Sequence, residues 1–195
     1  MGGNHHHMQA STTKDRIVEL SRNAIQSLGY HSFNYRQIAD ELKIKNAAIH
    51  HYFPAKEDLG VAVVEKDLED FKGMINKLRS ATPTKRIEFF LKAYAGYFEN
   101  GQKLCVIGTF CSTYSSIPEK IAASSKTYMD TLVTWLTGNF KEGLESGEFN
   151  FRIAVEDMVN LWVTALPGTL QTGRIRGSRK FYQSLNSLKR LLKEE

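Results

Sequence analysis

The sequence predicts an all-α fold of about nine helices, and three observations support that prediction. Apolar residues recur at the three- and four-residue spacing of amphipathic helices along most of the chain. No stretch alternates apolar and polar residues for more than a few positions, as a half-buried strand would. Glycine and proline divide the helical pattern into segments, because neither is favourable inside a helix. We therefore expect helices throughout and no β-sheet.

Three helices are expected near the N-terminus, with the bounds 13–28, 35–42 and 46–53. Thr12 and Asp15 have the spacing of a capping box, which predicts the start of the first helix. Asn34 and Gln37 repeat this spacing before the second helix. Pro54 ends the third, because a proline cannot continue a helix.

Six further helices are expected, with the approximate bounds 56–78, 83–101, 104–114, 118–147, 155–172 and 178–192. Thr82 followed by Pro83 is typical of a helix start, and Gly147 of a helix end. Pro167 and Gly168 fall inside the eighth helix, where we expect a kink.

The composition is that of an ordinary globular protein. The 195 residues are 42% hydrophobic and 24% charged, and no run of eighteen apolar residues predicts a membrane span. We expect a cytoplasmic protein without a membrane partner. Residues 1–11, MGGNHHHMQAS, resemble a tag and are excluded from the fold argument. The net charge of +5 permits binding to nucleic acid without requiring it.

Neither a metal site nor an enzyme is indicated. Cys105 and Cys111 lie six apart, a spacing that suits neither a disulfide framework nor a zinc site. His50 and His51 are adjacent, so they point about 100° apart on a helix and cannot chelate one ion. No paired carboxylates, glycine-rich phosphate loop or nucleophile motif occurs. We expect no cofactor and no catalytic residue.

The second and third helices have the pattern of a helix-turn-helix. Ile38, Ala39 and Leu42 share one face of the second helix, and Ile49 and Phe53 anchor the third. With these positions buried, the third helix presents its remaining residues outward, as a helix that enters a DNA major groove does. These residues are Asn46, Ala47, Ala48, His50, His51 and Tyr52.

The chemistry of these residues suits duplex DNA. Asn46 can pair bidentately with adenine, and Ala47 or Ala48 can contact a thymine methyl group. Donors to phosphate oxygens are expected at both ends of the third helix and on the second. They are Arg36, Lys45, His50, Tyr52 and Lys56.

The stretch NYRQIADELKIKNAAIHHYFPAKEDL resembles the DNA-binding segment of the TetR family of bacterial transcriptional regulators. The matching residues are Ile38, Ala39, Ile49, His51, Tyr52, Phe53, Lys56, Glu57 and Leu59. Three positions depart from the family pattern: Lys43 replaces a turn glycine, Lys45 a serine, and His50 an aromatic residue. A left-handed Lys43 would be mildly strained.

The resemblance implies two domains and a function. Residues 12–55 would bind a double-stranded DNA operator, and residues 56–195 would bind a small-molecule effector and form a homodimer. The expected protein is a regulator, most often a repressor in this family, that releases its operator when the effector binds. The last two helices would pair with their mates in a partner chain, unless their apolar faces only close the core of the monomer. The dimer residues expected there are Met158, Leu161, Trp162, Ala165, Phe181, Leu185 and Leu188.

Aromatic residues are frequent in the middle helices, and a few hydroxyl groups accompany them. Such a mixture is typical of a small-ligand pocket, although core packing explains any one ring equally well. By resemblance, the pocket would open among the helices that begin near Lys56, Pro83, Leu104 and Pro118. The expected lining residues are Phe71, Phe90, Tyr94, Phe98, Cys105, Thr109, Phe110, Tyr114, Tyr128, Trp135 and Trp162.

Two alternative functions remain open from the sequence. The segment KLCVIGTFCSTYSSIPEKI resembles part of those TetR-like repressors that sense electrophiles or oxidants through a cysteine, and Cys105 occupies the matching position. Leu104 stands where that group has a glycine, and cysteines there are also ordinary packing residues. The other alternative is a helical structural or adaptor protein that does not bind DNA.

Overall fold

The computed structural model describes residues 11–193, and nearly all of the tag-like segment lies outside this range. Within it the chain forms nine α-helices, one short 3₁₀ turn and no strand, so the all-α prediction is confirmed. The helices are α1 (Thr13–Leu28), α2 (Tyr35–Leu42), α3 (Asn46–Tyr52), α4 (Lys56–Lys77), α5 (Pro83–Glu99), α6 (Val106–Ser112), α7 (Glu119–Glu145), α8 (Val155–Arg176) and α9 (Ser178–Leu191). The 3₁₀ turn is Tyr114–Ser116.

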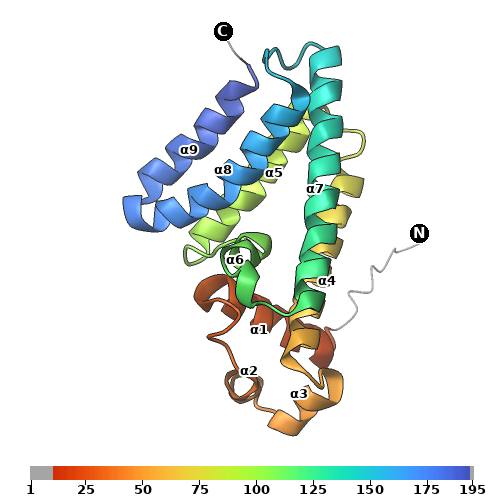
Figure 1. The fold of residues 1–195 in the computed structure, drawn as a ribbon, viewed down its shortest axis with the longest axis vertical. Helices are drawn as coiled ribbons and strands as arrows, with labels where there is room; N and C mark the ends of the chain where they lie inside the picture. Colours follow the sequence, from red (N-terminus) through yellow and green to blue (C-terminus); the bar gives the residue numbers. More distant parts are fainter. Residues whose placement is uncertain (1–10, 194–195) are drawn as a thin grey trace, which may run out of the picture.

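The helices are arranged around the long helices α4 and α7 (Figure 1). Helices α1–α3 form one end of the molecule, and α4 leads from that end alongside α7 into the larger domain. Helices α8 and α9 form an antiparallel pair on the side of the larger domain away from α4. Gly60 brings α4 close to α7, because a Cβ atom at that position would collide with Ile121. The long helix α4 therefore connects the two ends of the molecule.

The first three helices form as the local sequence predicts. Thr12 and Asp15 make a complete capping box at α1, and Asn34 and Gln37 make another at α2. Ile44 N–H donates to the Ala39 carbonyl, which holds the tight turn after α2. These contacts fix the direction in which the chain enters α3.

Lys43 occupies the left-handed region in that turn, with φ 56° and ψ 42°. A side chain is strained there, so we expect Lys43→Gly to raise the free energy of unfolding by about 0.5–1 kcal/mol. Lys45 provides the matched control, because its φ of −74° suits any residue. Lys45→Gly should give no gain in urea unfolding. Equal or opposite effects at the two positions would show that Lys43 is not strained.

Two clusters of buried residues form the core. One lies beneath α1–α3 and includes Ile17, Ile38 and Ile49, together with residues of α4, α6 and α7 such as Val63 and Phe110. The other fills the larger domain between α4, α5, α7, α8 and α9. The first cluster extends across residue 55, the expected domain boundary, so the DNA-binding end has no core separate from α4.

Two segments differ from their expected bounds. Helix α8 continues through Pro167 to Arg176, beyond the expected end at residue 172, and its axis bends in the C-terminal half (Figure 1). The expected helix 104–114 is shorter, because Cys105 caps α6 and a 3₁₀ turn follows at Tyr114. Gly177, with φ 83°, separates α8 from α9.

Candidate functional site

Helix α3 is fixed to the protein by one face. Ile49 is its only buried residue and is fully inaccessible to solvent, and Phe53 is buried immediately after the helix. The Tyr35 hydroxyl donates to the Phe53 carbonyl at 2.9 Å, which ties the end of α3 to the start of α2. His50 packs edge-on against the Tyr35 ring at 4.8 Å. These contacts fix the orientation of α3 relative to α2.

The opposite face of α3 is open to solvent, as the sequence predicts. The exposed residues are Lys45, Asn46, Ala47, His50, His51 and Tyr52, whereas Ala48 is half-buried. Arg36 on α2 is also exposed, with 88% of its side chain accessible, and its Nε lies 3.9 Å from an Asp40 oxygen. This surface carries hydrogen-bond donors and acceptors and, within residues 34–53, Arg36, Lys43 and Lys45 against Asp40 and Glu41. It has the shape and the chemistry that a major groove accepts.

Lys56 has a second role that its sequence position does not reveal. Its ammonium lies over the rings of Tyr30 and Phe33, at 4.8 and 4.5 Å from their centroids, and 3.5 Å from the His31 carbonyl oxygen. Burial lowers the pKa of Lys56. The residue therefore fastens the start of α4 to the loop between α1 and α2, in addition to the phosphate contact expected of it.

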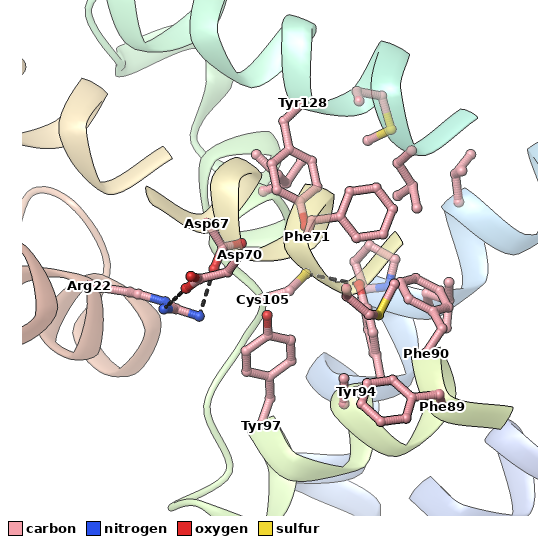
Figure 2. Close-up of a pocket in the computed structure, with 18 residues that line it drawn as sticks. Arg22, Asp67, Asp70, Phe71, Phe89, Phe90, Tyr94, Tyr97, Cys105 and Tyr128 are labelled. Atoms are coloured by element: carbon pink, nitrogen blue, oxygen red, sulfur yellow. Dashed lines mark hydrogen bonds and ion pairs between the residues drawn. The ribbon is translucent and has the colours of Figure 1, made fainter. Parts of the chain in front are cut away.

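A cavity of about 310 Å³ lies between the two ends of the molecule (Figure 2). Its walls come from α1, α4, α5, α7 and α8 and from the start of α6. Most of its lining is apolar, with one polar end. The lining residues are Arg22, Asp67, Asp70, Phe71, Met74, Phe89, Phe90, Ala93, Tyr94, Tyr97, Cys105, Ile107, Tyr128, Met129, Leu132, Val163, Leu166 and Pro167.

The structure brings together part of the expected lining. Phe71, Phe90, Tyr94, Cys105 and Tyr128 line the cavity as predicted. The other expected residues do not, namely Phe98, Thr109, Phe110, Tyr114, Trp135 and Trp162.

Each of these six residues lies in an environment other than the cavity lining. Phe98 stacks on Phe181 at 4.2 Å, and Trp162 is buried against Phe140. Trp135 packs behind the cavity wall against Phe71 and Phe90. The Thr109 hydroxyl donates to the Cys105 carbonyl, and Phe110 belongs to the core beneath α1. Tyr114 is 66% exposed, outside the cavity.

The polar end of the cavity was not predicted. Arg22 of α1 lies 2.8 Å from an Asp67 oxygen and donates to Asp70 at 2.9 Å, so it links α1 to α4 (Figure 2). The Asp67 side chain is only 3% exposed. Burial outweighs the attraction of Arg22 and raises the pKa of Asp67 to about 6. The pattern contains a signal for this residue, since Asp67 follows Val63 by four positions and precedes Phe71 by four on the buried face of α4.

Cys105 lies in an environment that disfavours the thiolate. Its sulfur accepts hydrogen bonds from the Tyr94 hydroxyl at 3.1 Å and from Gly108 N–H at 3.3 Å. Burial nevertheless raises the pKa of the Cys105 thiol to about 11. Since the thiolate is the reactive form, we expect the thiol of Cys105 to react slowly at neutral pH.

We expect a disulfide exchange reagent such as DTNB to modify Cys111 rapidly and Cys105 slowly in the folded protein. Cys111 is exposed, whereas Cys105 is buried. Cys111→Ala should remove the fast phase at neutral pH, and Cys105→Ala should leave it unchanged. A fast phase that disappears with Cys105 instead would support the electrophile-sensor hypothesis.

The expected dimer surface needs a correction. Met158, Trp162, Phe181, Leu185 and Leu188 are buried inside the single chain, where they pack α8 and α9 against the larger domain. In the single chain they close the core, which is the alternative that the sequence left open for these apolar faces. Of the expected residues, Leu161 is 42% exposed and Ala165 is half-buried.

The described residues give no support for a metal site or a membrane span. Within residues 11–193, no group of three or more histidine, cysteine, aspartate and glutamate side chains is placed to hold a metal ion. No helix in the same range combines the length and the hydrophobicity that crossing a bilayer requires.

Comparisons with known proteins agree with the DNA-binding geometry. Residues 17–63 match the sequence model of a family described as bacterial regulatory proteins, tetR family. These residues extend from α1 into α4 and include the whole helix-turn-helix. No match was found among curated proteins.

Solved structures of the same architecture extend the likeness to nearly the whole chain. A TetR transcriptional regulator from Legionella pneumophila is 28% identical, with a TM-score of 0.84 over 95% of this chain and 100% of that one. A TetR-family regulator from Agrobacterium tumefaciens is 22% identical, with a TM-score of 0.86 over 93% of this chain and 97% of that one. A regulatory protein TetR from Rhodobacter sphaeroides is 17% identical, with a TM-score of 0.80 over 90% of this chain and 96% of that one.

Proposed function

We propose that this chain, which belongs to the TetR family of transcriptional regulators, is a repressor that binds its operator as a homodimer and releases it when a small molecule enters the cavity. DNA binding through a helix-turn-helix is a property of the family. The dimer, the effector and the direction of regulation are the proposed parts.

The exposed face of α3 is the observation that carries the proposal. The helix is anchored through Ile49 and presents Asn46, Ala47 and His51 to solvent. Any amphipathic surface helix exposes polar residues, so the identity of these groups is what favours DNA: an amide, an imidazole and a small side chain on the second helix of a helix-turn-helix. Base edges of a major groove provide partners for these groups.

Exposed apolar residues on α8 support the homodimer. Leu161 is 42% exposed and Ile175 is 90% exposed in the single chain, and both belong to α8. Helix-turn-helix proteins commonly bind two half-sites one helical turn apart, which requires two copies of the reading helix. A partner packed on α8 and α9 would supply the second copy.

Helix α4 supports the coupling between effector and operator. Its residues Asp67 and Phe71 line the cavity, and Lys56 at its start contacts the loop between α1 and α2. A ligand that favours a different position of α4 shifts the population of molecules whose α3 helices fit the operator.

Salt-dependent binding to duplex DNA tests the DNA-binding role. We expect affinity for random duplexes to fall steeply with salt, by about 10³-fold between 50 and 200 mM if some six phosphates are contacted. Lys45→Ala should weaken binding to all sequences alike and lower the salt slope by about 1. Lys141→Ala is the control, because Lys141 is exposed and belongs to the C-terminal part of α7, the end of that helix that lies away from α3 (Figure 1). Affinity that does not respond to salt would contradict the DNA-binding role and favour the adaptor.

The electrophile-sensor hypothesis receives less support. Its residue, Cys105, is buried with a raised pKa, and Tyr94 and Gly108 donate to its sulfur. No cation is among the groups that lower the pKa of this thiol. Reversible occupation of the cavity is therefore the form of regulation that we propose.

A further inference from the structure

The cavity has an acidic end that faces an aromatic one. Asp67 and Asp70 lie at one end, and Phe71, Phe90 and Tyr128 are among the rings at the other (Figure 2). In that view the carboxylates lie between the Arg22 guanidinium and the rings. A ligand in the cavity would therefore contact a carboxylate at one end and ring faces at the other.

The charges around the acidic end do not cancel. Glu19, Asp67 and Asp70 surround Arg22 at 3.5, 2.8 and 2.9 Å. Lys66 adds a second positive charge, which pairs with Asp70 at 2.7 Å and lies 3.7 Å from Glu69. Four carboxylates thus share two cations. An anionic ligand would add a fifth negative charge, whereas a cation would compensate one that is already present.

Asp67 is the carboxylate with capacity for a ligand. Only 3% of its side chain is exposed, and it lines the cavity. No group in residues 11–193 donates a well-formed hydrogen bond to its Oδ1 atom, although that atom lies 2.8 Å from Arg22. If a ligand took Asp67, Arg22 would still be held by Asp70 and Glu19.

The aromatic end suits a cation as well. Phe71 and Tyr128 stack with centroids 5.6 Å apart, and Phe90 and Tyr94 are also 5.6 Å apart. Ring faces attract a cation placed within about 6 Å of their centroids, most strongly where water is excluded. A neutral apolar ligand would use these rings but would leave the excess of carboxylates over cations at the acidic end unchanged.

We propose that the cavity recognises a small organic cation, an amine or quaternary ammonium that bears an apolar group, with Asp67 as its counter-ion. This inference rests on the proposed role of the cavity as the effector site, and it adds the chemical class of the effector. The cation draws the Asp67 carboxylate away from Arg22 and so loosens a direct link between α4 and α1. Ligand binding is in this way connected to the position of the DNA-binding helices.

Three probe ligands of similar size distinguish the effect of ligand charge on affinity from the effect of ligand shape. Benzyltrimethylammonium is the cation, neopentylbenzene its neutral isostere, and phenylacetate the anion. Binding to the full chain without DNA is followed by tryptophan fluorescence, because Trp135 contacts Phe71 and Phe90 behind the cavity wall. We expect the cation to bind at least about tenfold tighter than the isostere, which corresponds to ~1.4 kcal/mol, and phenylacetate to bind weakest.

Asp67→Asn should reduce the ratio between cation and isostere to about one, whereas Asp130→Asn should leave it unchanged because Asp130 is exposed on α7 and pairs with Lys126. If Asp67→Asn does not fold, the ratio of the two affinities in the wild-type protein alone tests the inference. A cation that binds no tighter than its isostere, or a ratio that Asp67→Asn leaves intact, would overturn the inference. A protein that does not bind DNA would instead contradict the proposed function. The ratio of probe affinities is measured without DNA, so the two failures can be distinguished.

Discussion

We expect Asn46→Glu to weaken operator binding by about a thousandfold while the protein remains folded. Asn46 is exposed in the first turn of α3, where we propose that it contacts a base. The substitution removes a bidentate contact worth about 1–3 kcal/mol and places a negative charge against the phosphates of the groove. A glutamate near a helix N-terminus is favourable for the helix itself, so stability should not fall.

Asn76→Glu is the matched control for this prediction. Asn76 is exposed in the last turn of α4, at the far end of that helix from α3. The same change of charge there should leave DNA affinity within about twofold, because it is separated from the groove by more than a Debye length of roughly 8–10 Å. Equal losses at the two positions would mean that overall charge, and not the placement of α3, determines binding.

We expect Arg22→Met to lower the free energy of unfolding by about 3–5 kcal/mol above neutral pH, because it leaves the buried Asp67 carboxylate without its partner. Arg22 is itself largely buried, and burial of Asp67 is nearly complete. Removing an exposed cation has a much smaller effect. Arg36→Met should cost less than about 0.5 kcal/mol, since Arg36 is almost fully exposed.

The loss caused by Arg22→Met should shrink as the pH falls. The pKa of Asp67 in the folded protein is already raised to about 6, above its ordinary value of 3.8, and removing Arg22 raises it further. An acid whose folded pKa is raised binds a proton more tightly in the folded state, so its destabilising effect is complete above the folded pKa and declines as pH falls through it. Urea unfolding at about pH 8 and about pH 5.5 therefore compares the charged and neutral forms of Asp67.

The double variant Arg22→Met with Asp67→Asn should recover most of the stability at the higher pH, because no unpaired charge remains. A loss that is the same at both pH values, or that the second substitution does not relieve, would assign the effect of Arg22 to packing alone.

Local signals made α1–α3 predictable from the sequence. Capping pairs such as Thr12 with Asp15 act within one helical turn, so they are visible in the sequence and appear unchanged in the structure. The outward face of α3 followed from Ile49 and Phe53, because anchoring these two residues leaves few orientations for the helix. The exposed face of α3 could be predicted for this reason.

The dimer surface and the cavity depend on contacts between distant segments, and the sequence does not reveal these. The periodicity of α8 shows that Trp162 lies on an apolar face, yet not whether a partner or the chain's own Phe140 covers it. The polar end of the cavity joins Arg22 to residues some forty-five positions further along. Asp67 interrupts the apolar face of α4, and a charged residue at a core position is the signal that identifies such a site.

Selection of bound duplexes from a random library tests the central claim most directly, namely that α3 reads DNA in two symmetric copies. We predict enriched sequences with two half-sites related by a two-fold axis, and a loss of preference at one position in each half-site for Asn46→Ala. His51→Ala should relax a different position of each half-site in the same symmetric way. Enriched sequences without two-fold symmetry, or preferences that neither substitution alters, would contradict the account.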